Sequence, residues 1–183
     1  LYCNVPESAF EHFGISSSAE NTLAVTLSRK EGDPNPFTID DNAFAYSSIK
    51  QFTIPYYVNQ VGKNAFEFSS LGKFEFNTDN LHTLEILEGA FYNCNFGQNP
   101  IAIPVTVTSI GQRAFANCIT ESVTISGNSA IGNLAFYGST METLTFGDFP
   151  STFESYSFAK CQNIKKLDFG NIQTIPPLAF EED

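Results

Sequence analysis

The dipeptide Ala-Phe recurs at nearly even spacing along the whole chain. It ends at Phe10, Phe44, Phe66, Phe91, Phe115, Phe136 and Phe180, and Ser157-Phe158 fills the one remaining slot. From Phe44 onward the steps between these phenylalanines are 22, 25, 24, 21, 22 and 22 residues, whereas the first step is 34 residues. A period of about 20 to 29 residues indicates a solenoid of stacked coils. Such folds mostly present a long surface to a partner, and they seldom bury a catalytic pocket.

Three further columns repeat with the phenylalanine. An apolar residue stands five positions before it: Val5, Ile39, Val61, Ile86, Ile110, Ile131, Phe153 and Ile175. A small residue stands three positions after it in most coils: Ser47, Ser69, Cys94, Cys118, Ser139 and Cys161. An apolar pair with a period of two follows: Phe52/Ile54, Phe74/Phe76, Ile101/Ile103, Val123/Ile125, Leu144/Phe146 and Leu167/Phe169.

These columns predict the structure of one coil. The alternating pair predicts a short strand with one face inward. The segment from the apolar residue to the phenylalanine has helical or 3₁₀ spacing, and we expect it to pack on the other side of the core. Gly62, Gly111 and Gly132 stand where a tight turn suits a residue without a Cβ. Pro55 and Pro104 end their strands, because proline cannot continue the ladder.

Several segments resemble the BspA-type leucine-rich repeats: IGQRAFANC at 110–118, IPVTVTSIG at 103–111, VGKNAF at 61–66 and IGNLAF at 131–136. The resemblance extends from about Val5 to Phe180. It implies an α/β solenoid, a right-handed leucine-rich-repeat superhelix with one parallel sheet on its concave face and short helical or 3₁₀ turns opposite. It also implies an extracellular or cell-surface protein of a host-associated microbe, with a role in adhesion and host-protein binding.

We expect a single domain over residues 1–183 with about seven to eight coils. Residues 1–38 depart from the repeat and are expected to form an irregular N-terminal coil or cap, with a polar, proline-containing loop at 29–36. Residues 175–183 begin a coil that lacks its strand. Either the acidic residues 181–183 protect that edge, or the chain is a piece of a longer protein.

The charge of the chain disfavours one class of partner. The formal net charge is −11, and the few Lys and Arg residues are scattered, so nucleic acid binding is not expected. No apolar run is long enough to cross a membrane. The chain opens at Leu1 without a signal peptide, and we interpret this as a processed or trimmed N-terminus.

The four cysteines allow two interpretations. Cys94, Cys118 and Cys161 share a column with serines, so we expect small buried sites with free thiols that face backbone groups. The alternative is a Cys94–Cys118 bridge between neighbouring coils. Cys3 lies outside the column and has no assigned partner.

We predict no enzyme and no cofactor. The two histidines, His12 and His82, lack a nucleophile motif such as G-x-S-x-G, and no zinc-site spacing or phosphate-binding glycine loop occurs. The carboxylates are scattered as on a solvated surface. Asp40 and Asp41 are expected to cap a helix N-terminus, with a calcium site there or at 31–35 as the weaker alternative.

The outward residues of the strands are the candidate ligand-binding face. They are Gln51, Thr53, Lys73, Glu75, Ser122, Thr124, Thr143, Thr145, Lys166 and Asp168, with Ala102 in the same row. This face is polar, rich in threonine at its centre and without large aromatic anchors. Tyr56, Tyr57, Tyr92 and Tyr137 lie off the strands and are alternative anchors. The threonines also have a simpler explanation, since threonine is a good exposed strand residue.

Three functions fit this pattern. The first is a surface module that binds a protein, for example one of the host extracellular matrix or plasma, through the concave face or the 29–36 loop. The second is a structural spacer within a larger surface protein. The third and weakest is carbohydrate binding or hydrolysis, which needs aromatic platforms or paired carboxylates on one face.

Overall fold

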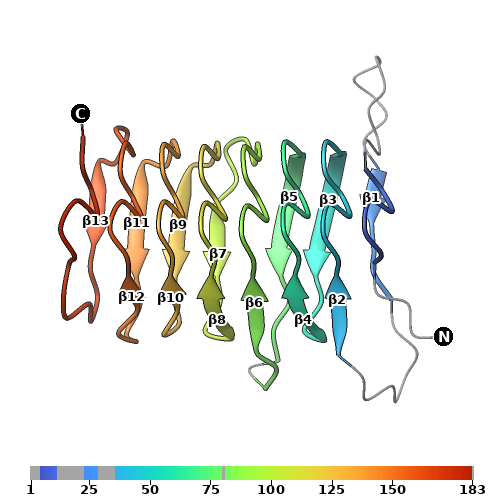
Figure 1. Ribbon diagram of the computed structural model, residues 1–183, viewed down its shortest axis with the longest axis horizontal. Helices are drawn as coiled ribbons and strands as arrows, with labels where there is room; N and C mark the ends of the chain where they lie inside the picture. The colour runs from blue at the N-terminus through green and yellow to red at the C-terminus, as the bar shows by residue number, and fades with distance from the viewer. Residues whose placement is uncertain (1–4, 12–22, 29–35, 80, 183) are drawn as a thin grey trace.

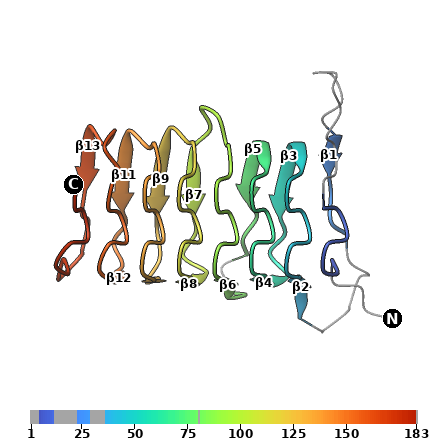
Figure 2. The ribbon, with the colours of Figure 1, turned by 45° about the horizontal axis from the view of Figure 1, so that its top comes forward.

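The computed structural model describes residues 5–11, 23–28, 36–79 and 81–182. Cys3, His12, nearly all of the 29–36 loop and the possible calcium site at 31–35 lie outside the described residues. The coils stack side by side in a nearly straight row in both views (Figures 1 and 2). The chain is therefore a parallel β-solenoid, as the repeat predicted.

Strands lie on two sides of the row. On one side are β1 (Leu23–Val25), β3 (Ser48–Ile54), β5 (Ser70–Phe76), β7 (Ile101–Ile103), β9 (Ser122–Ile125), β11 (Thr143–Phe146) and β13 (Lys166–Asp168). On the other side are β2 (Phe37–Ile39), β4 (Val58–Val61), β6 (Leu84–Ile86), β8 (Val107–Ile110), β10 (Ala130–Ile131) and β12 (Thr152–Phe153). Every pairing between these strands is parallel, because each coil repeats the direction of the one before.

Five of the six alternating apolar pairs lie on a strand as predicted, whereas β13 ends before Phe169. The prediction of a single sheet was wrong. The even-numbered strands form a six-stranded sheet of their own, and each ends at the apolar residue five positions before the phenylalanine. The odd-numbered strands form two separate sheets, β1-β3-β5 and β7-β9-β11-β13. The strands of the six-stranded sheet have only two to four residues, too few for a clear period of two in the sequence.

The helical or 3₁₀ segment was also wrong, because the described residues contain no helix. Turns link each even-numbered strand to the next odd-numbered one instead. In the Phe66 coil, Ala65, Glu67 and Ser69 each donate a backbone N–H to the carbonyl three residues earlier. The intervening N–H groups of Asn64, Phe66 and Phe68 donate to carbonyls of the next coil. A helix would use these donors internally, whereas here they bind the coils together.

Left-handed residues stop these turns from continuing into a helix. The residue two positions before the phenylalanine has a positive φ in every coil, as at Asn42, Asn64 and Gly89. From the Phe44 coil to the Phe158 coil, the residue two positions after the phenylalanine also has a positive φ, as at Asn93, Asn117 and Gly138. Asn and Gly tolerate this conformation better than other residues, which explains why they recur here.

The predicted helix cap at Asp40 and Asp41 was therefore wrong. Asp41 Oδ1 instead accepts the backbone N–H of Lys63 in the next coil at 2.7 Å. Gly62 and Gly111 have another role than a tight turn, since neither has a positive φ. A Cβ on Gly111 would lie 2.7 Å from the backbone nitrogen of Glu88, so close approach between coils requires the glycine.

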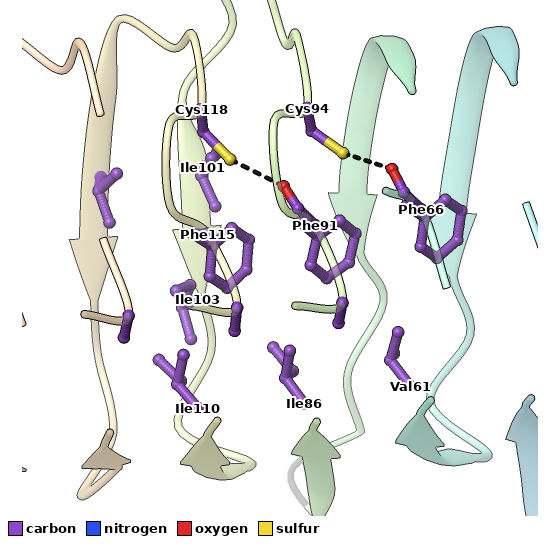
Figure 3. Close-up of a cluster of buried hydrophobic side chains, with 14 of the residues drawn as sticks. Val61, Phe66, Ile86, Phe91, Cys94, Ile101, Ile103, Ile110, Phe115 and Cys118 are labelled. Carbon is purple, nitrogen blue, oxygen red and sulfur yellow. Dashed lines mark hydrogen bonds between the residues drawn. The ribbon is translucent and has the colours of Figure 1, made fainter. Parts of the chain in front are cut away.

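The phenylalanine column forms a continuous ladder through the core. Neighbouring rings stack with centroids 4.8 to 5.2 Å apart and interplanar angles of 3° to 12°, from Phe10 to Phe180. Figure 3 shows the rings of Phe66, Phe91 and Phe115 beside inward residues of two sets of strands. These are Val61, Ile86 and Ile110 of the six-stranded sheet and Ile101 and Ile103 of β7. One ring shape repeated at one position therefore fills the core of every coil.

The serine and cysteine column fastens each coil to the previous one. Each side chain donates to the carbonyl of the preceding phenylalanine: Ser47 to Phe10, Ser69 to Phe44, Cys94 to Phe66, Cys118 to Phe91, Ser139 to Phe115 and Cys161 to Phe136, at 2.6 to 3.0 Å. Figure 3 shows the two central thiol contacts. The prediction that this column faces backbone groups is confirmed.

Candidate functional site

The outward residues of β3, β5, β7, β9, β11 and β13 form the surface that we call the strand face. On β9, β11 and β13 the register aligns Ser122, Thr143 and Lys166 in one ladder and Thr124, Thr145 and Asp168 in the next. Ala102 extends the second ladder on β7. Six of the predicted residues are therefore brought together as the period-two pattern required.

The other four predicted residues form a separate group. Gln51 lies opposite Lys73, and Thr53 lies opposite Glu75, on β3 and β5. Lys73 Nζ and Glu75 Oε1 form an exposed ion pair at 3.1 Å. The predicted row is interrupted between β5 and β7, because these two strands do not pair.

A cleft of about 610 Å³ opens at this interruption. Its walls are β5 and the start of β7, and three predicted residues line it: Thr53, Lys73 and Glu75. Ala102 lies on the opposite wall. The cleft has the size of an ordinary ligand site.

Sequence reasoning missed five of the lining residues: Phe74, Phe76, Asn77, Asn99 and Pro100. Phe74 and Phe76 were assigned to the core, yet both also border the cleft. Asn99 and Pro100 belong to residues 96–100, which displace β7 from β5. The signal was present, since the apolar pair Ile101/Ile103 follows its phenylalanine two positions later than in regular coils.

Hydrogen bonds hold the displaced segment in place. Asn95 Oδ1 accepts the N–H of Gly97 at 2.8 Å, and Asn99 Nδ2 donates to the Phe96 carbonyl at 2.6 Å. Thr120 Oγ1 in the next coil donates to the Asn99 carbonyl at 2.7 Å. The wall of the cleft is therefore built into the fold.

The comparison with protein families agrees with this architecture. The family model for the BspA type leucine-rich repeat region matches six copies, over residues 37–101 and 84–183. This chain belongs to the BspA-type leucine-rich repeat family. No curated protein and no solved structure matched it.

Several aromatic side chains of this BspA-type protein lie outside the core, on the turns between strands. Tyr46 and Phe68 stack at 5.2 Å on the turns, and Tyr92 meets Phe68 edge-on at 5.6 Å. Tyr56, at the opposite turns, is 44% exposed. Tyr57 is no free anchor, because its hydroxyl donates to the Leu27 carbonyl at 2.9 Å.

Burial makes the three cysteine thiols of the BspA-type coils unreactive. Cys94, Cys118 and Cys161 are free and buried, so the Cys94–Cys118 bridge was wrong. Burial raises the pKa of all three thiols, that of Cys161 to about 12. They stay protonated near neutral pH, and a protonated thiol is neither a nucleophile nor a metal ligand.

Polar groups elsewhere do not gather into a second site. His82 Nδ1 lies 2.7 Å from Asp79 Oδ2 on an exposed turn, and the Leu81 N–H and His82 lower the pKa of the Asp79 carboxyl. Among the described residues, no three His, Cys, Asp or Glu side chains are grouped as a metal ion would require. No helix that is long and apolar enough to span a bilayer occurs in the described part of the chain.

Proposed function

We propose that this chain is a non-enzymatic binding module that engages a protein ligand through the strand face. The observation that carries this proposal is the open cleft between β5 and β7, flanked by ladders of polar side chains in fixed register. Solenoids of this kind use extended surfaces for recognition. The resemblance discussed above further suggests a secreted or surface-exposed adhesion protein of a host-associated microbe.

A binding screen tests the proposal. The purified chain is measured against a panel of extracellular-matrix and plasma proteins, beside the double variant Thr124→Arg/Thr145→Arg. These two residues are half-buried neighbours on β9 and β11, so two arginines there obstruct the strand face. We expect saturable binding by the natural chain and its loss in this variant.

A matched variant controls for added charge. Ala130→Arg/Thr152→Arg puts the same two charges on neighbouring exposed positions of the six-stranded sheet. Binding should survive this change. Binding that survives Thr124→Arg/Thr145→Arg, or that both variants lose equally, contradicts recognition by the strand face.

A structural spacer is the second candidate. The nearly straight row of coils and the unbroken phenylalanine ladder favour it, because both give a stiff rod. A spacer needs no ligand on the strand face, so a complete absence of binding across the panel favours this function over the first.

A further inference from the structure

Three aromatic side chains gather on the turns that lead into β3 and β5. Tyr46 lies two residues before β3, and Phe68 lies two residues before β5. Their rings stack at 5.2 Å, and Tyr92 of the following coil meets the Phe68 ring edge-on at 5.6 Å. Tyr46 and Phe68 remain 38% and 46% exposed, so solvent reaches both rings. Together with Glu67, these residues form the surface that we call the turn patch.

Backbone hydrogen bonds between coils hold the turn patch in place. The Tyr46 N–H donates to the Glu67 carbonyl at 2.7 Å, and the Phe68 N–H donates to the Tyr92 carbonyl at 2.8 Å. The four residues therefore lie side by side in three successive coils. A partner meets a surface that is already ordered, which lowers the entropy cost of binding.

The backbone conformation of Tyr46 and Phe68 is unfavourable for such large residues. Their φ angles are 57° and 55°, in the left-handed region that few residues other than glycine and asparagine tolerate. Asn93, Asn117 and Gly138 occupy the same position in three later coils. Tyr46 and Phe68 thus cost free energy and still leave their rings exposed. Unfavourable conformations of this kind gather at functional sites, so the two rings indicate a binding role.

Glu67 adds an unpaired negative charge to the turn patch. Glu75, Glu88 and Glu142 each form an ion pair with a lysine. Within the described part of the chain, no group forms an ion pair or a hydrogen bond with the Glu67 carboxylate. Partial burial raises the pKa of this carboxyl, because its surroundings disfavour the charged form. A cation from a partner would therefore stabilise the carboxylate.

The charge of the chain and the chemistry of the turn patch favour the same ligand group. A formal net charge of −11 attracts basic partners and repels acidic ones. Among cationic side chains, arginine has a planar guanidinium that stacks on aromatic rings and pairs with a carboxylate through two N–H groups. Lysine carries a compact, strongly hydrated charge that suits such a surface less well.

We infer that the turn patch binds an arginine side chain in a basic segment of a partner protein. The guanidinium pairs with the Glu67 carboxylate and lies against the rings of Phe68 and Tyr92. Arginine and tyrosine are among the residues that contribute most to the binding energy of protein interfaces. The turn patch lies outside the strand face, so this inference does not depend on the proposed function.

A short labelled peptide of alternating arginine and glycine tests the inference. Its binding to the full chain is measured by fluorescence anisotropy at physiological ionic strength, where attraction between distant charges is screened. We expect saturable binding that Glu67→Gln weakens by about tenfold. Glu121→Gln removes the same charge from an exposed position on another coil and should leave the affinity unchanged. No binding, or equal losses in the two variants, overturns the inference.

A second pair of variants tests the rings. Phe68→Asn removes one ring, and the coil should keep its structure because Asn93 and Asn117 hold the same position elsewhere. We expect a loss of about tenfold in affinity for the arginine peptide. Tyr56→Asn removes a ring that is 44% exposed on the opposite turns and should leave the affinity unchanged. Unchanged affinity in Phe68→Asn overturns the inference, and if this variant fails to fold, the comparison of Glu67→Gln with Glu121→Gln still decides.

A peptide with lysine in place of arginine tests the choice of ligand group. It carries the same charge but lacks the planar guanidinium, so we expect it to bind about threefold or more weakly than the arginine peptide. Equal affinity of the two peptides overturns the assignment of arginine.

Discussion

At the scale of single residues, the position three residues after the repeated phenylalanine accommodates either a serine or a cysteine in most coils, with a different hydrogen bond for each. Where the residue of this column in the next coil is a serine, its hydroxyl accepts the backbone N–H of the column residue one coil earlier. Ser47 donates to Ser69 in this way, and Cys118 donates to Ser139. Where the residue in the next coil is a cysteine, the backbone N–H donates instead to the phenylalanine carbonyl three residues earlier in its own coil. This holds for Ser69, Cys94 and Ser139. Sulfur is a weak acceptor, so the backbone N–H forms its hydrogen bond with the carbonyl oxygen instead.

Substitution of Ser139 tests this account. Ser139→Ala removes the donor to the Phe115 carbonyl and the acceptor of the Cys118 N–H, and should cost about 1–3 kcal/mol of unfolding free energy. Ser139→Cys should cost less, because the thiol still donates and the Cys118 N–H adopts the arrangement seen at Cys94. Urea denaturation of the two variants measures the difference. Equal losses would show that the hydroxyl is not needed as a donor.

At the scale of the element, the turn is the part of the coil that departs most from expectation. Its segment has the apolar spacing of a helix, yet left-handed residues on both sides of the phenylalanine break it into successive turns. Some coils place poorly suited residues there. Arg113 has φ of 55° and is exposed, so the backbone conformation costs free energy that its side chain does not recover.

Replacement of Arg113 should therefore stabilise the protein. Arg113→Asn introduces the residue that Asn42 and Asn64 provide in other coils, and we expect a gain of about 0.5–1 kcal/mol. Arg113→Ala removes the same charge but keeps the unfavourable φ, so it should give no gain. Thermal unfolding of both variants compares them, and an equal gain in the two variants would point to charge instead of conformation.

At the scale of the whole molecule, the phenylalanine ladder couples neighbouring coils and the sheet interruption divides the strand face. In a solenoid each coil contacts only its neighbours, so stability is close to a sum of coil and interface contributions. A change at a ring in the middle of the ladder therefore disturbs the stacking with the coil before it and with the coil after it.

The position of a truncated ring should therefore matter. Phe115 is fully buried between Phe91 and Phe136, and Phe115→Ala should cost about 3–5 kcal/mol. Phe10→Ala should cost clearly less, because Phe10 is 38% exposed. Guanidinium denaturation followed by circular dichroism measures both. Similar losses at the two positions would contradict this dependence on the burial of the ring.

Much of the fold followed from repetition in the sequence. The columns correctly identified the stacked phenylalanines, the strand positions of the alternating pairs, the buried free thiols and the register of Ser122, Thr143 and Lys166. These features depend on one residue per coil recurring at a fixed offset, which a single sequence records directly. The ligand-binding role of the strand face remains a prediction.

Other features depended on how coils meet in space. The six-stranded sheet arises because strands too short to show a period of two gain their hydrogen bonds from neighbouring coils. The turns are not helices because their N–H groups are used between coils, and Gly111 is required by the nearby backbone of Glu88. The cleft is a tertiary feature as well. The sequence shows that the Ile101/Ile103 pair comes two residues late, but only the tertiary structure shows that β5 and β7 do not pair and that a cleft opens there. Local repetition thus determined the coil and its core, whereas contacts between coils decided the six-stranded sheet, the turns and the cleft between β5 and β7.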